Sequence, residues 1–566
     1  MRIVSRGLSA AVIGLLLSGP ALAQDQEDVV VDEVVEGGDP RLPLATGARF
    51  LEDPLETVVQ QRRRPDVGKL YLGVVSATEI HAYENRDYQA LDESTDQRVI
   101  DTDDRRNFGH TDIAATLAYR PQQAIQLDTQ LKYDLVWRDD GLGRTANNPG
   151  VFNVFRLSMT YAFVESQDFT LKATFGRQPF QIGGVPTDYM LNGTLDAITV
   201  DADFGAFGGL RILAIDFFAG HDQPVSGYQY FRDGSETVFG LRGETNTLRT
   251  GAVYDYDRKF KGGDAFGMKA YYFYATVGGG PIDQSGANIT YGGTLGNFRD
   301  RDYQHMMGAR ASYKIDFGDT GALNLFGEFA RSAGIDRRPV VERDVDTSGN
   351  AYGGGAELSV RGGKRSSFYL EADFYHFDGA QYASDGLEFE RGFVGFRGAR
   401  LGGLTLGRQS AWRPSAHLDA FGVDHTPQDI SRSAGTQFIH AAAGTRLGDY
   451  SLRFDFWTFT DTSSTFLDLD NIDAIDDPPF GRSRAEFEAQ ARAGKTLGQE
   501  YDIELSRRFG DGEDRSSGFR IYTNFSAFLP GDYYATKVNR VAGQRLTALG
   551  GDATFWAFRF GTMVSF

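Results

Sequence analysis

The stretch AIQLDTQLKYDLVWR, residues 124–138, alternates apolar and polar side chains over most of its length. In an extended chain Leu127 and Leu131 share one face, while Asp128 and Lys132 share the other. A helix would scatter these residues around its axis. The length matches a strand that crosses a membrane at a tilt, with one face against lipid and the other against a polar interior.

The same alternation recurs near 152–165, 305–316, 449–461 and 517–529. Short connections rich in Gly, Pro, Asp and Ser alternate with long ones, which include 332–350, 378–387 and 410–435. This pattern is typical of outer-membrane barrels with short periplasmic turns and long extracellular loops. We therefore expect an all-β fold, a single transmembrane antiparallel β-barrel; direct counting from Lys69 gives 20 strands, within a range of 16–20.

The N-terminus resembles a secretory signal, with Arg2 and Arg6 ahead of an apolar run and Ala21-Leu22-Ala23 as a cleavage site. We expect a signal peptide over 1–23, a disordered acidic periplasmic extension over 24–68, and the barrel over 69–566. The last strand ends in alternating apolar residues. They resemble the signal that barrel-assembly machinery reads and predict outer-membrane localisation; the residues are Phe560, Val564 and Phe566.

Composition narrows the function. The 566 residues include no cysteine, which excludes Cys-based metal and thiol chemistry, and we expect no cofactor. A net charge of −19 argues against nucleic acid as a partner. Acidic stretches at 92–104 and 468–477 read as solvated loops, with weak divalent-cation binding as an alternative.

Residues 496–505, TLGQEYDIEL, followed by FLPGDYY at 528–534 and the closing aromatic strand, resemble the bacterial alginate-export family. The segment FGRQPF at 175–180 is similar to a strand end of the same family. This resemblance implies an 18-stranded outer-membrane channel that exports an anionic polysaccharide through a constriction rich in Arg and Lys.

A second resemblance is to general diffusion porins. It rests on RGFVGFRG at 391–398 and GLTLGRQ at 403–409, which look like one porin hairpin. The Gly-Arg-Gln triplet occurs twice, each time at a strand end before a long loop. We expect a structural role there more than solute contact, for Arg177, Gln178, Arg408 and Gln409.

The polar faces of the predicted strands supply charges of both signs to the lumen. They could select ions if the signs segregate in space, or they could neutralise one another. The candidates are Lys132, Arg156, Lys172, Arg249, Lys269, Arg310, Lys314, Glu371, Asp373, Arg453, Asp455, Asp502, Glu504, Arg520 and Arg559.

No HExxH or GxSxG motif is present, so we expect no enzyme. His417 and His425 in a loop are the one candidate for hydrolysis, and an ordinary polar loop is the preferred interpretation. The leading hypothesis is an outer-membrane channel for polar or charged solute, most like an alginate exporter. The alternatives are a general diffusion porin and a structural or adhesive barrel with a plugged lumen. Expected partners are outer-membrane lipid and lipopolysaccharide, barrel-assembly machinery, and a polar solute or polysaccharide.

Overall fold

The computed structural model describes residues 65–84, 106–137, 151–166, 168–181, 192–216, 246–278, 301–338, 343–363, 366–379, 381–382, 388–390, 392–393, 436–462, 496–509, 518–531, 538–539, 547–548 and 554–565. The expected signal peptide, nearly all of the expected extension, both acidic stretches, His417, His425, Arg408, Gln409 and Phe566 lie outside these residues. The predictions made for them stay predictions. Among the described residues, no helix has the length and apolar character needed to cross a membrane.

The described residues are almost entirely strand. The strands are β1 (Leu70–Glu84), β2 (Arg106–Gln122), β3 (Ile125–Trp137), β4 (Val151–Glu165), β5 (Thr170–Gln181), β6 (Asn192–Asp203), β7 (Gly209–Asp216), β8 (Asn246–Lys259), β9 (Ala265–Gly278), β10 (Arg301–Asp316), β11 (Gly321–Arg338), β12 (Arg343–Gly363), β13 (Ser366–Phe377), β14 (Gln381–Tyr382), β15 (Glu388–Glu390), β16 (Thr436–Leu447), β17 (Tyr450–Asp461), β18 (Thr496–Phe509), β19 (Gly518–Pro530), β20 (Val538–Asn539), β21 (Thr547–Ala548) and β22 (Phe555–Ser565). Two 3-10 turns, η1 (Gly205–Phe207) and η4 (Gly318–Thr320), connect neighbouring strands.

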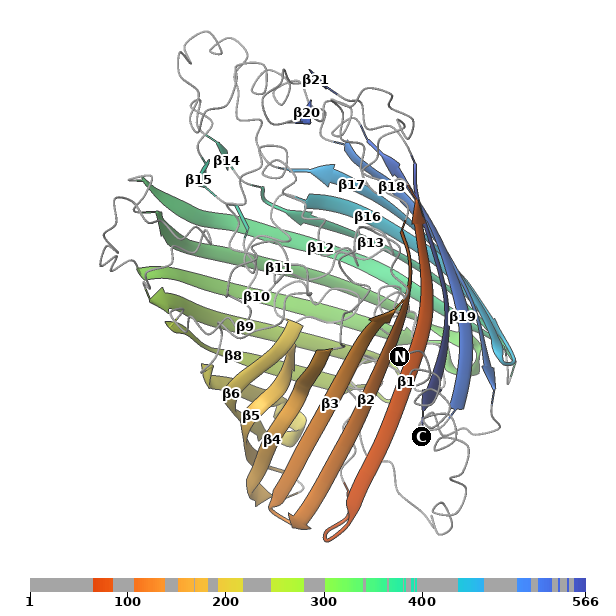
Figure 1. Ribbon diagram of the computed structural model, residues 1–566. Helices are drawn as coiled ribbons and strands as arrows, with labels where there is room; N and C mark the ends of the chain where they lie inside the picture. Colours follow the sequence, from red (N-terminus) through yellow and green to blue (C-terminus); the bar gives the residue numbers. More distant parts are fainter. Residues whose placement is uncertain are drawn as a thin grey trace, which may run out of the picture. The chain divides into compact units, whose positions relative to one another are not determined.

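The strands form a closed ring. One sheet contains 20 of the described strands; two of them, β14 and β15, are short additions at the edge of β12, which leaves 18 in the ring. Each strand from β1 to β13 pairs antiparallel with the next, followed by β16, β17, β18, β19 and β22. The ring closes where β22 pairs with β1 over Val75 to Glu84, as Figure 1 shows for the first and last strands of the colour series. This confirms the single antiparallel barrel of about 18 strands.

The direct count of 20 strands is wrong, and the excess lies at 388–409. The porin-like sequence there predicted a hairpin between two long loops. In the structure β13 pairs directly with β16 from Ser366 to His376, so no further strand fits between them. Within that stretch the structure describes β15, which pairs antiparallel with β14 and parallel with β12.

The prediction of a long loop at 332–350 is also wrong. Strands β11 and β12 pair continuously up to Arg338 and Arg343, with only 339–342 between them. Charged residues such as Arg337 resembled a loop in the sequence. Antiparallel strands tolerate polar residues where a face is solvated, so the ladder can continue through them.

Exposed and buried side chains alternate along each strand, which distinguishes the outer face of the ring from the inner face. On β4, Leu157 and Phe163 are 58% and 56% exposed, whereas Arg156 and Ser158 are 2% and 6% exposed. On β22, Trp556, Phe558 and Phe560 lie on the exposed face, opposite buried Arg559. Large apolar side chains thus cover the outer face and polar ones line the inner face. This is the arrangement of a transmembrane barrel, and within residues 124–138 it agrees with an outward Leu127, 38% exposed, and an inward Asp128, 4% exposed.

Gly176 on β5 marks a close approach between neighbouring strands. Its φ of +104° is a backbone conformation that side-chain-bearing residues rarely adopt. A Cβ atom there would lie 2.3 Å from the carbonyl oxygen of Leu157 on β4. Glycine is therefore required at this position by both backbone geometry and space.

Gly176→Ala should lower the free energy of unfolding by about 1–3 kcal/mol, because the strained backbone and the clash with β4 act together. Urea unfolding in detergent micelles, followed by tryptophan fluorescence, measures this. Gly262→Ala is the matched control, since no atom lies within 4 Å of a Cβ there. Equal effects of the two substitutions would contradict the packing argument.

Candidate functional site: the charged inner wall

The strand register places the predicted pore-lining residues on the inner face. Arg453 lies opposite Glu504 and Asp455 opposite Asp502, while Lys269 lies opposite Arg310. For Lys132 and Arg249 the structure describes the strand position but not the side chain. The described members are Arg156, Lys172, Lys269, Arg310, Lys314, Glu371, Asp373, Arg453, Asp455, Asp502, Glu504, Arg520 and Arg559.

Near the short turns at 204–208 and 260–264, the inner wall carries ion pairs that solvent reaches. Arg211 Nε lies 2.5 Å from Asp201 Oδ1, and Lys269 Nζ lies 3.3 Å from Asp255 Oδ1. Their side chains are between 20% and 43% exposed. Each pair joins residues directly opposite on neighbouring strands, so positive and negative charges alternate along this part of the wall. We call these four residues the turn-end ion pairs.

On the next strands of the ring, β10 and β11, the charged side chains are more buried than those of the turn-end ion pairs. Arg310 lies 3.3 Å from Glu328 and stands over the ring of Phe326, 4.5 Å from its centre. The hydroxyl of Tyr271 donates to Glu328 at 3.1 Å. Glu328 is 6% exposed and is satisfied by two donors, so this carboxylate binds protein groups rather than solvent.

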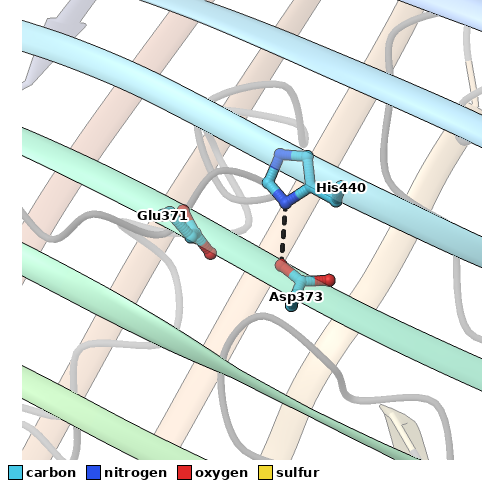
Figure 2. A group of neighbouring side chains, drawn as sticks. All are labelled: Glu371, Asp373 and His440. Carbon is cyan, nitrogen blue, oxygen red and sulfur yellow. Dashed lines mark hydrogen bonds and ion pairs between the residues drawn. The ribbon is translucent and has the colours of Figure 1, made fainter.

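The densest charge cluster lies on β13, β16 and β17. Arg453 contacts both oxygens of Asp455, at 2.6 Å from Nε and 2.5 Å from Nη2, and its Nη2 lies 3.4 Å from Glu371. His440 lies between two carboxylates: Nδ1 is 2.8 Å from Asp373 and Nε2 is 2.9 Å from Asp455. Figure 2 shows Glu371 and Asp373 side by side on β13, with the ring of His440 above Asp373. All five side chains are buried.

Polar contacts continue from this cluster to the closing strands. Arg520 pairs with Glu504, which also accepts from Asn524 Nδ2 at 3.0 Å. Arg559 on β22 lies 3.3 Å from Glu79 on β1, and Tyr522 donates its hydroxyl to the same carboxylate. The ring closure is therefore fixed by side chains as well as by the backbone.

Like charges also face each other on this wall. Glu357 lies opposite Glu371, and Asp455 opposite Asp502. Directly opposed like charges destabilise a sheet. Arg453 compensates for Glu371 and Asp455, whereas Asp502 has no cation paired with it among the described residues. The wall of β12, β13, β17 and β18 thus has a local excess of acid.

Towards the long connections the inner wall becomes aromatic. Tyr375, Phe438 and Trp457 pack in sequence across β13, β16 and β17, and Trp457 stacks on His440 with ring centres 3.7 Å apart. Phe393 packs on Phe377 at 5.8 Å and is fully buried. The segment at 392–393 also lies against Gly349 of β12, so it rests on the inner face of the wall.

The first Gly-Arg-Gln triplet makes structural contacts. Arg177 donates to the carbonyl oxygen of Val154 at 3.0 Å. Gln178 is 3% exposed, donates to the carbonyl of Ala197 at 3.2 Å and accepts from Thr199 at 2.9 Å. The second triplet, with Arg408 and Gln409, lies outside the described residues. At the C-terminal strand, Phe560 is exposed on the outer face and Val564 is half-buried.

Sequence reasoning missed several inner-wall residues. Asp201, Arg211 and Glu79 follow the same alternation as the predicted set, and extending the register along β6, β7 and β1 would have found them. His440 gave no such signal. Its inward neighbours on β16 are Phe438, Ala442 and Gly444, so that face is not polar.

Arg453→Ala should lower the free energy of unfolding by about 3–5 kcal/mol, because it leaves Asp455 and Glu371 buried without their cation. Urea titration of the purified barrel measures the loss. Arg331→Ala, at an exposed position on β11, is the control and should change stability little. A small effect at Arg453 would show that this cluster is not tightly coupled.

No sequence family matches the chain, and no curated protein matches it. Solved structures that are similar include OccK5 (OpdH) of Pseudomonas aeruginosa, at 10% identity and a TM-score of 0.41, covering 89% of this chain and 99% of that chain. OccAB2 of Acinetobacter baumannii has 11% identity and a TM-score of 0.45, with the same coverage of 89% and 99%. The outer membrane protein OprD of Pseudomonas aeruginosa has 10% identity and a TM-score of 0.40, covering 88% and 94%. The alginate-export resemblance gains no support from these comparisons.

Proposed function

We propose that this protein is an outer-membrane channel through which polar solutes pass by diffusion. The observation that carries the proposal is the set of turn-end ion pairs. They place charged, partly solvent-exposed side chains on the inner wall of a closed 18-strand ring. Barrels of 16–18 strands leave an aqueous passage, whereas barrels of about eight strands are filled by side chains.

General diffusion fits the described wall better than export of an anionic polysaccharide. An exporter of polyanions needs a cationic constriction. Here Lys269 and Arg211 are paired with acids, and the wall around Asp502 and Glu371 has an excess of carboxylates. A wall of this charge attracts cations more than anions. We further propose that the barrel performs no catalysis.

Reconstitution of the full-length protein in a planar lipid bilayer should give stepwise increases in conductance with a preference for cations. Reversal potentials in a salt gradient measure that preference. A barrel that inserts without conducting would favour the plugged, adhesive alternative. Block of the current by anionic oligosaccharides, with anion selectivity, would favour polysaccharide export.

Lys269→Glu should shift the reversal potential towards stronger cation selectivity, because it replaces a cation of the turn-end ion pairs with an acid beside Asp255. Asp255→Lys should shift it in the opposite direction. Arg258→Glu is the matched control, since Arg258 lies on β8 in the alternate register, outside the pair. Identical reversal potentials for all three variants would place the conducting path away from this wall.

A further inference from the structure

Glu371, Asp373 and His440 form a compact group of possible metal ligands. One oxygen from each carboxylate and one ring nitrogen of His440 all lie within 4.8 Å of one another. Figure 2 shows that the three side chains come from two paired strands, β13 and β16. Asp373 and His440 are direct cross-strand partners, which fixes their separation through the backbone.

A further pair of residues orients the imidazole. Asp455 is 2.9 Å from Nε2 of His440, and Arg453 contacts both oxygens of Asp455. Stacking on Trp457 holds the plane of the ring. A carboxylate that accepts the N–H of one ring nitrogen leaves the other nitrogen free to bind a metal, and this is the usual second layer of a zinc site.

The other nitrogen, Nδ1, is directed at a carboxylate. It lies 2.8 Å from Asp373, while Nε2 is already turned to Asp455. A neutral imidazole has one N–H, so a lone pair would face a carboxylate at one side of the ring. The arrangement therefore needs a cation between Nδ1 and Asp373, which is either a proton or a metal ion.

Charge and hydrogen bonding favour a metal ion of charge two. Among the described residues, the carboxylates of Glu371, Asp373 and Asp455 face the guanidinium of Arg453, so this group carries two net negative charges when His440 is neutral. Glu357 on β12 lies directly opposite Glu371 and adds a further carboxylate, which interacts electrostatically with Lys314. Independently, Oδ1 of Asp373 accepts no hydrogen bond from any described residue, although the Asp373 side chain is 1% exposed. A buried carboxylate oxygen without a donor is costly unless an ion satisfies it.

We propose that Glu371, Asp373 and Nδ1 of His440 bind a divalent transition-metal ion of the Zn²⁺ type. Two carboxylates and an imidazole suit such an ion, with ligand distances of about 2.0–2.2 Å. The ring and the Asp373 carboxylate need to separate by roughly half an ångström to admit it. The ion joins β13 to β16, the two ring strands that flank the long segment 378–435. This site is independent of whether the barrel conducts.

The test uses full-length protein, freed of metal by a chelator in urea and refolded into detergent with Zn²⁺ or Co²⁺. The expected result is one ion per chain by elemental analysis and a visible absorption spectrum for bound Co²⁺. His440→Ala and Asp373→Asn should abolish the stoichiometric binding. Asp455→Asn should weaken it on the order of 10- to 100-fold, as loss of an outer-layer partner does.

His376→Ala is the matched control. His376 lies on β13 in the alternate register, 3.2 Å from Asp378, and its replacement should leave metal binding unchanged. Heat-dependent mobility in SDS gels reports whether each variant has folded. The proposal is overturned if the folded wild-type protein binds no ion. It is also overturned if His440→Ala and Asp373→Asn bind like the wild type, or if ¹⁵N NMR with excess Zn²⁺ finds both nitrogens of His440 protonated.

Discussion

The structure depends on one constraint: in a lipid bilayer every backbone N–H and C=O must find a partner within the protein. A sheet meets this only if its two edges pair with each other, and here β1 pairs with β22 to do so. The outward apolar face and the inward polar face follow from closure, because the two faces of each strand meet different surroundings. Closure also gathers charges from distant parts of the chain onto one inner wall.

Much of this could be read from the sequence. Strict alternation in residues 124–138 assigns each side chain to a face, and the structure keeps Leu127 outside and Asp128 inside. The alternation is misleading where pairing between other strands determines the structure. At 388–409 the pattern of a hairpin is present, but β13 and β16 pair with each other and leave it no place in the ring. Strand pairing is a property of the whole sheet, which a local period cannot reveal.

The sequence predicted which charged residues face inward, but not which of them contact one another. Alternation identifies Arg453 and Asp455 as inward residues, yet their coupling to Glu371 depends on the register between three strands. His440 was missed because small and apolar residues share its face of β16. The small residues on this face also make room for larger ones: the ring of Tyr369 lies over Gly444, and Ala442 lies opposite both Glu371 and Asp455.

The contact of Tyr522 with Glu79 joins residues that are 443 positions apart in the chain. Contacts of such sequence separation form late, because the entropy of a long loop must be lost before they contribute. Until then the sheet has two open edges, at β1 and β22, which can pair with any other strand they meet. Completion of the barrel therefore depends on the meeting of its first and last strands, and until they pair both edges of the sheet stay open.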